Sequence, residues 1–180
     1  AIEPGAAMTA SLKVNLELNP GLPVTVHNVA VGDAAGEVLL HHFSDLPHGH
    51  ASTSTLGRDD FDTEPVPCLR LDDLLGEAVR PPTLIKMDVE GSELVALRGA
   101  AAVIEAKRSI WIVEVNHQTS AAFGYAPTEL LDRFCADYAF YRIAAGGLLP
   151  EQDRAAAPHG TMWLCVPPAL DERLDGLVVA

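Results

Sequence analysis

The segment Leu84–Leu94, with the sequence LIKMDVEGSEL, constrains the fold more than any other part of the chain. It begins as an apolar run and then places Asp88, Glu90 and Glu93 within six residues. A second run, SIWIVEV at Ser109–Val115, is also almost continuously apolar. Strands that are covered on both faces have such runs, so both segments are predicted to be central strands of a sheet.

Helical and strand periods alternate along the rest of the chain. Met8, Leu12 and Leu16 recur every four residues, which predicts a helix. The β-branched run Val24–Val31 predicts a strand. This alternation favours an α/β layer fold. Further strands are expected at 36–43, 66–71, 139–144 and 161–166, and further helices around Leu94–Ile104, interrupted at Gly99, and around Leu131–Tyr138.

The length and the apolar content fit a single domain, which we place at residues 1–180. The hydrophobic fraction of 48% is enough for a sizeable core. The strands expected at Ala139–Ala144 and Thr161–Val166 have no obvious helix between them. They are therefore predicted to form an antiparallel hairpin at one edge of a mostly parallel sheet.

The composition argues against several classes of protein. The chain has 25 Asp and Glu against 12 Lys and Arg, a net charge of −13 that would repel phosphates, so no nucleic-acid partner is expected. The three cysteines are too far apart for a zinc knuckle or a disulfide framework, and we expect reduced, buried thiols. No segment reaches the roughly 18 apolar residues of a membrane helix, and no secretion signal is visible. We therefore expect no membrane span and a cytoplasmic location.

Acidic residues follow several of the expected strands. In open α/β sheets, ligands bind beyond the carboxyl ends of the strands. Ile2-Glu3-Pro4 has the pattern of a strand end, Asp88 and Glu90 follow one central strand, and Glu114 with His117 follows the other. We expect these acids to converge on one edge of the sheet. Acids in unrelated, solvated turns would have no reason to converge.

Five stretches of the chain carry a resemblance to a known family. They are AIEPGAAMTASLKVNLELN, VTVHNVAVGD, LRLDDLL, LIKMDVEGSELVALRGA and WIVEV. Together they resemble the FkbM-type methyltransferases over Ala1 to His117, and IKMDVEGSE is the most specific part. The resemblance implies a class I, Rossmann-like methyltransferase fold and S-adenosyl-L-methionine as cofactor. It also implies O-methylation of a hydroxyl on a sugar or a polyketide-like small molecule.

One element of that family has no counterpart in this sequence. The family's glycine-rich first strand lies between the strands that end here at Glu3 and Asp88, and its loop cradles the methionine end of the cofactor. We therefore expect an N-terminally incomplete methyltransferase domain. The alternative is a truncated, non-catalytic module for binding or assembly. A nucleotide-dependent oxidoreductase lacks support because no G-x-G-x-x-G is present.

The resemblance implies roles for the acids in the first part of the chain. Glu3 is expected to accept hydrogen bonds from the ribose hydroxyls, although a surface acid near the N-terminus is the simpler alternative. Asp33 is expected to contact adenine, and a Gly-Asp turn explains it equally well. Asp88 is expected near the methionine amino group or the acceptor hydroxyl. Glu90 is expected to contact that hydroxyl or to orient a base.

Glu114 and His117 complete the set of candidate catalytic residues. A histidine suits proton abstraction near neutral pH, so His117 is a candidate base. A surface histidine in a loop is the alternative. Lys86 and Asp88 share one face of their strand, so Lys86 is expected to be a buried lysine paired with Asp88 or Asp72. Glu93 is explained by the dipole of the helix that it opens, and we leave it out of the site.

A polar stretch from His41 to Asp60 contains a cluster of histidines. His41, His42, His48 and His50 lie near Asp45, and imidazole with carboxylate can bind a transition metal. The spacing matches no metal signature, so no metal site is predicted. A polar loop over the pocket is the simpler interpretation, and a lid over the acceptor is another. The sequence leaves the acceptor and the oligomeric state open.

Overall fold

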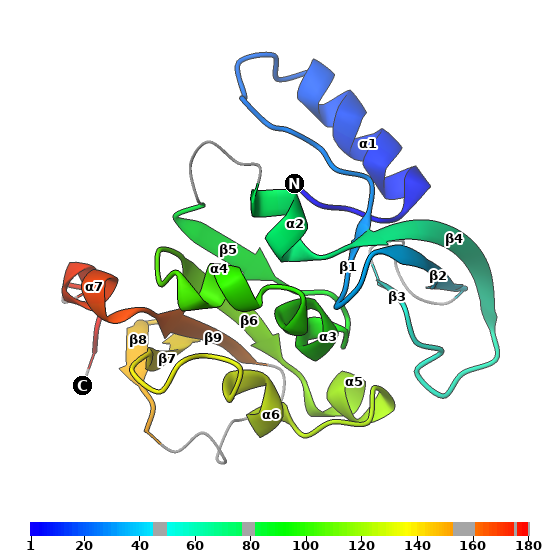
Figure 1. Cartoon of the computed structure of the whole chain (residues 1–180). Coiled ribbons are helices and arrows are strands. Elements are labelled where there is room, and N and C mark those ends of the chain that lie inside the picture. Colours follow the sequence, from blue (N-terminus) through cyan, green and yellow to red (C-terminus); the bar gives the residue numbers. More distant parts are fainter. Residues whose placement is uncertain (45–49, 77–81, 153–160, 175, 180) are drawn as a thin grey trace.

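The chain folds into two β-sheets with helices around them (Figure 1). The structure is a computed structural model, and it describes residues 1–44, 50–76, 82–152, 161–174 and 176–179. The elements up to the middle of the chain are α1 (Ala6–Glu17), β1 (Ala30–Val31), β2 (Gly36–Phe43), β3 (Ala51–Ser52), β4 (Phe61–Leu69), α2 (Leu71–Gly76) and β5 (Leu84–Met87). They are followed by α3 (Glu93–Arg98), α4 (Ala101–Glu105), β6 (Ile110–Val115), α5 (His117–Ala122), α6 (Pro127–Leu131), β7 (Ala139–Ala144), β8 (Gly147–Pro150), β9 (Thr161–Val166), α7 (Pro168–Asp171) and the 3-10 helix η2 (Glu172–Leu174).

Both sheets are mixed. The first has four strands in the order β1-β4-β2-β3, and the second has five in the order β5-β6-β9-β7-β8. β1 is parallel to β4 and β5 is parallel to β6, whereas the other ladders between named strands are antiparallel. The α/β class is as expected. The described residues, however, form mixed sheets rather than the mostly parallel sheet that we predicted.

The central strand β6 sets the two faces of the five-stranded sheet. Trp111, Val113 and Val115 point to one face and are fully buried. The alternation of a strand sends Ile112 and Glu114 to the other face. Since β5 pairs with β6 in parallel, with Met87 beside Val113 and Lys86 beside Ile112, the same division holds for β5.

Helices cover only one of these faces completely. The main core joins β6 to α3, α4 and α6 through Leu97, Ile104 and Leu131. On the opposite face a smaller core, around Leu164 and Leu174, lies below α7 and η2. That second face is open near β5, where Leu84 is 53% exposed. The β5 end of the sheet is therefore accessible from one side.

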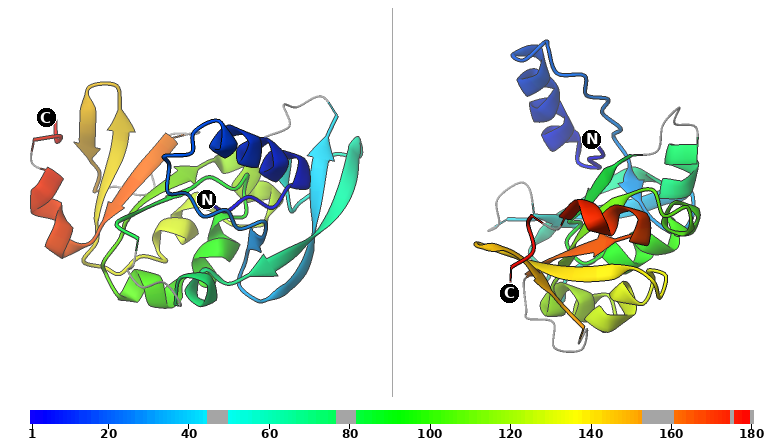
Figure 2. Two further views of the ribbon diagram at one scale, coloured as in Figure 1. Left: turned by 90° about the horizontal axis from the view of Figure 1, so that it is seen from above. Right: turned by 90° about the vertical axis from the view of Figure 1, so that its left-hand side faces the viewer.

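The helix α1 stands apart from the rest of the molecule. The right-hand view of Figure 2 shows it projecting away from both sheets. Thr9 is its one buried residue, and Val14 near its end is 54% exposed. The predicted stripe of Met8, Leu12 and Leu16 lies in a helix as expected, but these side chains are only half-buried.

The strand predicted at Val24–Val31 is much shorter in the structure. Only β1, at its end, belongs to a sheet. Before that, a single parallel bridge joins His27 to Ile2. An extended segment needs a neighbouring strand to form a ladder, and Ile2 is the one partner that the described residues supply here. The β-branched run therefore extends without becoming a full strand.

The helix predicted around Leu131–Tyr138 ends at its first residue. α6 stops at Leu131, and Phe134 and Tyr138 lie in turns that follow it. Both rings are nevertheless buried, with their centroids 5.3 Å apart. The ring of Trp111 lies 5.8 Å from that of Phe134. Leu131, Phe134 and Tyr138 are thus all buried in the core, as their spacing suggests, but they do not belong to one helix.

Strands β7, β8 and β9 near the C-terminus pair in an antiparallel manner, and β8 is a strand that the sequence did not predict. β7 and β9 pair with each other, but β9 lies between β6 and β7 in the interior of the sheet. The hairpin at the edge consists of β7 and the unpredicted β8. The two-residue turn of Ala145 and Gly146 is short enough for β8, which begins at Gly147, to pair with β7.

The three cysteines are free thiols, as their spacing predicts. Cys68 and Cys165 are buried and Cys135 is half-buried. None of the helices in the described ranges combines the length and the apolar composition that a bilayer crossing requires.

A close approach between two glycines joins β1 to α3. Gly99 ends α3, and a Cβ built on it would lie 1.9 Å from the carbonyl oxygen of Gly32. The carbonyl oxygen of Gly99 also accepts a hydrogen bond of 2.8 Å from the backbone N–H of Asp72 at the start of α2. Only glycine at position 99 allows these three elements to meet.

Gly99→Ala is expected to lower the free energy of unfolding of the full-length protein by about 1–3 kcal/mol, because the added methyl must displace backbone. Urea denaturation measures the change. Gly36→Ala is the matched control, since a Cβ there meets nothing within 4 Å. Equal stability of the two variants would contradict the close approach of Gly99 and Gly32.

Candidate active site

A cavity of about 620 Å³ lies between the N-terminal segment and β5. Its lining includes Ala1–Gly5 from the N-terminus and Leu84–Glu90 from β5 and the turn after it. His42 on β2 and Ala51 on β3 also line it. Small-molecule sites have volumes of about 300–1,000 Å³. The cavity is therefore large enough for a nucleotide-sized ligand. It extends along β5 and past the carboxyl end of this strand.

Glu3 is fixed at the wall of this cavity by backbone contacts. Its N–H donates to the carbonyl oxygen of His27 at 3.0 Å, and its own carbonyl oxygen accepts from Asn28 Nδ2 at 2.9 Å. Its Oε1 accepts the N–H of Gly5 at 2.8 Å. Within the described residues, Oε2 makes no hydrogen bond and can accept one from a ligand.

Asp33 lies beside a second, smaller cavity of about 210 Å³. Thr53 and Ser92 line both cavities, so the two are neighbours. The Asp33 side chain is exposed. Burial raises the pKa of the Cys68 thiol, and the charge of Asp33 raises it further. The structure thus brings Asp33 close to the site without placing it on the main cavity wall.

The turn after β5 has an unusual backbone. Glu90 adopts φ +53° and Gly91 adopts φ +101°, so two consecutive residues are in the left-handed region. A non-glycine residue rarely adopts this conformation without support. A Cβ at Gly91 would also lie 2.8 Å from the ring of Phe123. Glycine at 91 is therefore required both by its φ and by the contact with Phe123.

Glu93 holds this turn from the inside. It is only 2% exposed, and its Oε1 accepts the N–H groups of Val89 at 2.9 Å and Gly91 at 3.3 Å. The hydroxyl of Tyr125 lies 3.2 Å from Oε2 and 2.9 Å from the Gly91 carbonyl oxygen. The expectation that Glu93 acts only through the helix dipole is incomplete, because its carboxylate satisfies the backbone of the turn. Ser92 precedes α3 but donates to the Val89 carbonyl oxygen instead of capping the helix.

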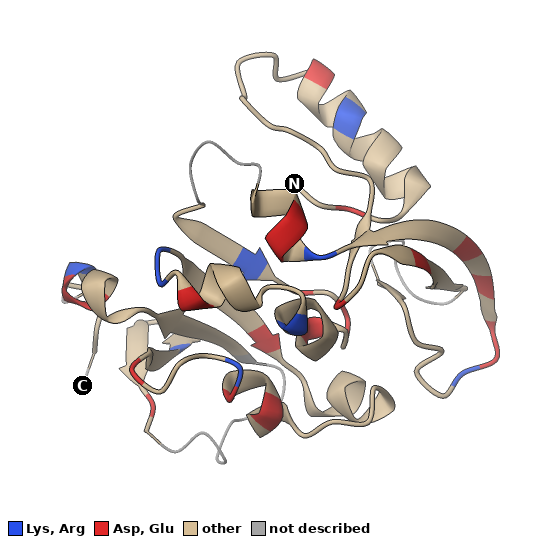
Figure 3. Cartoon of the chain, in the orientation of Figure 1, with Lys and Arg blue, Asp and Glu red and all other residues tan. Residues whose placement is uncertain are grey.

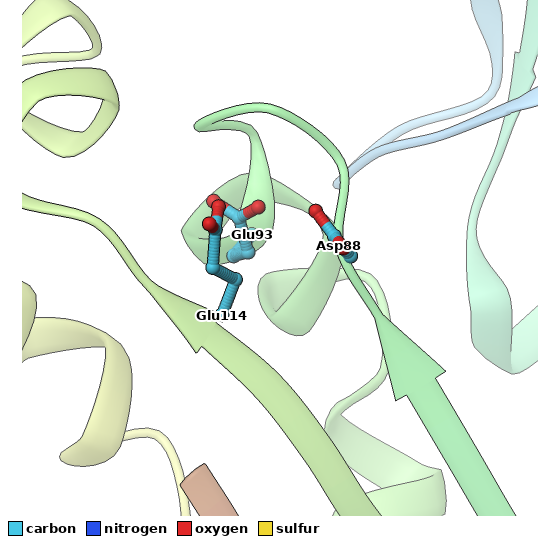
Figure 4. Close-up of side chains that lie close together, drawn as sticks. All are labelled: Asp88, Glu93 and Glu114. Atoms are coloured by element: carbon cyan, nitrogen blue, oxygen red, sulfur yellow. The ribbon is translucent and has the colours of Figure 1, made fainter. Parts of the chain in front are cut away.

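Three carboxylates meet at the ends of β5 and β6. One oxygen from each of Asp88, Glu93 and Glu114 lies within 4.8 Å of the others (Figure 4). Burial raises the pKa of Glu114 to about 6, and the charges of Asp88, Glu93 and Glu90 add to the effect. Glu114 Oε2 is buried, and no residue in the described ranges hydrogen-bonds to it. Burial also raises the pKa of Glu93, against the effect of its hydrogen bonds.

Carboxylate oxygens are the ligands that Mg²⁺ and Ca²⁺ prefer. Glu93 Oε1, however, already accepts hydrogen bonds from the turn, and Oε2 accepts one from the Tyr125 hydroxyl. The close spacing is explained by the folding of the turn, and we assign no metal to it. Figure 3 shows that acidic residues are spread over both halves of the molecule, so acidity alone does not mark this place as a site.

Lys86 and Asp88 form the expected ion pair, with 2.7 Å between Nζ and Oδ2. The lysine is not buried, however, because its side chain is 56% exposed on the open face of the sheet. An exposed pair of this kind contributes about 0–1 kcal/mol. Asp72 pairs instead with Arg70 at 2.9 Å and accepts the N–H of Val103 at 3.1 Å. The Asp88 side chain is itself 30% exposed, so a ligand can reach it despite the ion pair.

The histidines are arranged differently from the prediction. His117 opens α5, is exposed, and lines neither cavity. His42 belongs to β2 and lines the large cavity, with its Nε2 2.9 Å from Glu64 Oε2. His50 Nδ1 lies 3.0 Å from Glu90 Oε1. His41 is also part of β2, whereas the expected contributions of Asp45 and His48 lie outside the described residues.

His50 was missed as a site residue because the stretch around it was interpreted as a loop. His42 lies in the strand that was expected at 36–43, but no role in the site was assigned to it. No local signal announces the contact between His50 and Glu90, because the two residues are 40 positions apart in the sequence.

Glu114→Gln is expected to stabilise the protein at about pH 8 and to leave its stability nearly unchanged at about pH 4. The folded state raises the pKa of Glu114 to about 6 from the ordinary 4.5, so ionisation opposes folding once the pH rises through this interval. Below it, both states are protonated and the effect disappears. Thermal unfolding at several pH values measures the difference, with the exposed Glu105→Gln on α4 as control. A stabilisation that is independent of pH would contradict the raised pKa.

Comparisons with known proteins identify the family. The model of the methyltransferase FkbM domain matches residues 1–142. A crystal structure of a methyltransferase FkbM from Methylobacillus flagellatus KT shares the fold, with a TM-score of 0.55 and 21% identity over 91% of this chain. The chain spans 35% of that protein's chain. No curated protein matches it. Because the family model covers well over half of its residues, the chain belongs to the FkbM methyltransferase domain family.

Proposed function

We propose that this protein is an S-adenosyl-L-methionine-dependent O-methyltransferase whose cofactor binds in the cavity between Ala1–Gly5 and Leu84–Glu90. The observation that carries the proposal is that Glu3, Asp88 and Glu90 line one cavity although they come from different parts of the fold. Membership of a methyltransferase family supports the reaction class.

The residues on the cavity wall suit the parts of the cofactor. The free Oε2 of Glu3 accepts a ribose hydroxyl, as an acid at a strand end does in dinucleotide-binding folds. Asp33, beside the adjoining cavity, accepts from the adenine amino group. Asp88 lies near the amino group of the methionine part. When bound, the cofactor supplies a methyl group that is already activated on a positively charged sulfonium, and an acidic wall favours such a cation.

The sequence resemblance implies a further parallel strand, and the described residues leave unpaired edges beside this cavity for it to join. Within the described residues, β5 pairs only with β6, and Ile2 pairs only with His27. Both edges border the cavity. We propose that a parallel strand with a glycine-rich loop belongs between them, which would join the two sheets and close the methionine end of the site.

The protein's contribution to methyl transfer is mainly positioning. Holding the acceptor hydroxyl in line with the methyl group can lower the barrier by about 7–11 kcal/mol. A general base adds a factor of about 10²–10⁴. The acids at the ends of β5 and β6, Asp88, Glu90 and Glu114, are the side chains that orient the hydroxyl or take part in removing its proton. The proposed acceptor is a hydroxyl-bearing small molecule such as a sugar or a polyketide-like product.

Isothermal titration of S-adenosylhomocysteine into the full-length protein tests the proposal. We expect binding in the wild type and a loss of about 10- to 100-fold in Glu3→Gln, because a hydrogen bond to a charged group contributes about 1.5–3 kcal/mol. Glu105→Gln, at an exposed position on α4 that lines neither cavity, is the control and should bind like the wild type. Incubation with labelled cofactor and a panel of methyl glycosides then identifies the acceptor class.

Absence of S-adenosylhomocysteine binding by the wild type would remove the methyltransferase proposal. It would favour the alternative, a methyltransferase fold that serves as a binding or assembly module. Equal binding by wild type and Glu3→Gln would keep the reaction class but remove Glu3 as the ribose ligand.

A further inference from the structure

Ser52 on β3 and His50, just before β3, both contact the turn after β5. Ser52 on β3 donates its hydroxyl to the carbonyl oxygen of Glu90 at 2.9 Å, and Ser52 is only 1% exposed. The preceding histidine, His50, places Nδ1 at 3.0 Å from Glu90 Oε1. Glu90 is thus held at both its backbone and its side chain by a segment 38 to 40 residues away in the sequence.

The backbone of Glu90 makes this arrangement specific. Its φ of +53° is a conformation that a non-glycine residue keeps only when its surroundings hold it. The buried hydroxyl of Ser52 and the hydrogen bonds from the turn to Glu93 provide that support. The strained turn directs the Glu90 carboxylate toward His50 rather than into solvent.

The contact selects one tautomer of the imidazole. A carboxylate only accepts hydrogen bonds, so the neutral His50 ring must carry its proton on Nδ1. Its Nε2 then has a free lone pair. The side chain is 52% exposed, and no hydrogen bond to Nε2 is found within the described residues. A histidine whose second nitrogen is held by a carboxylate is the usual arrangement of a general base.

The imidazole contacts the wall of the large cavity through Glu90, although His50 itself is not one of the lining residues. Ala51, next to it in the chain, also lines this cavity.

We propose that His50 is the general base of methyl transfer, with Glu90 and Ser52 as positioning residues. This inference rests on the proposed methyltransferase function. Nε2 of His50 takes the proton of the acceptor hydroxyl while the hydroxyl oxygen bonds to the methyl carbon. The electron pair of the broken carbon–sulfur bond stays on the sulfur, which becomes a neutral thioether. The imidazolium is stabilised by Glu90 and returns its proton to water.

The tautomer of His50 is the first test, and it needs no acceptor. In full-length protein labelled with ¹⁵N-histidine, at about pH 8, NMR correlation spectra should show His50 with its proton on Nδ1. His50→Gln assigns the signal. Glu90→Met removes the acceptor and should shift the ring toward the Nε2–H form. A wild-type His50 with its proton on Nε2, or a tautomer that Glu90→Met leaves unchanged, would overturn the proposal.

Kinetics with the panel of methyl glycosides is the second test. His50→Gln should lower kcat by about 10²–10⁴-fold and leave KM for S-adenosylmethionine nearly unchanged. Glu90→Met and Ser52→Ala should lower kcat by smaller factors, and Glu105→Gln controls for nonspecific effects. A larger loss in His117→Gln than in His50→Gln would restore His117 as the base and overturn the inference.

The two proposals fail in distinguishable ways. If the wild type does not bind S-adenosylhomocysteine in calorimetry, the methyltransferase function itself fails. If it binds but His50→Gln transfers methyl groups at the wild-type rate, only the assignment of His50 fails. If no methyl glycoside is turned over by the wild type, a His50 ring with its proton on Nε2 would still overturn the proposal.

Discussion

The geometry of the site depends on one buried carboxylate. Glu93 accepts the N–H groups of Val89 and Gly91 and contacts the Tyr125 hydroxyl, so it replaces the water that a solvent-exposed turn would bind. Hydrogen bonds to a charged group contribute about 1.5–3 kcal/mol each, while burial of the charge opposes them and raises the pKa of Glu93. The balance holds the turn in its left-handed form, and the turn directs Asp88 and Glu90.

The same turn connects the two sheets. Contacts from β3 reach Glu90, and the close approach of Gly99 to Gly32 brings α3 against the end of β1. The contact with Glu90 lies at one end of the large cavity, near Asp88. Along its length, the cavity is bordered by the edges of β5 and of the segment around Ile2, which have no strand between them in the described residues. The site is therefore rigid at the acidic end and open along β5.

The sequence predicts the strands of the site better than its side-chain contacts. The apolar runs before Asp88 and Glu114 are local patterns, and β5 and β6 lie where those patterns predict them. Glu93 has the local signal of an ordinary helix-opening acid, and its burial depends on Tyr125, 32 residues later. The contact of His50 with Glu90 likewise depends on how two sheets meet. The periodicity of the sequence predicts which face of a strand or helix a side chain occupies. The function of that side chain depends on contacts with residues that are distant in the sequence.

The raised pKa of Glu114 connects stability to the proposed function. A carboxylate that is partly buried beside Asp88 and Glu93 opposes folding at neutral pH, and a neutral side chain of the same size would be more favourable there. Such crowding of like charges is common where a site must receive a cation or hold a proton. A sulfonium in the neighbouring cavity would reduce the repulsion. The acidic ends of β5 and β6 thus fit a site whose most stable state includes a positive charge.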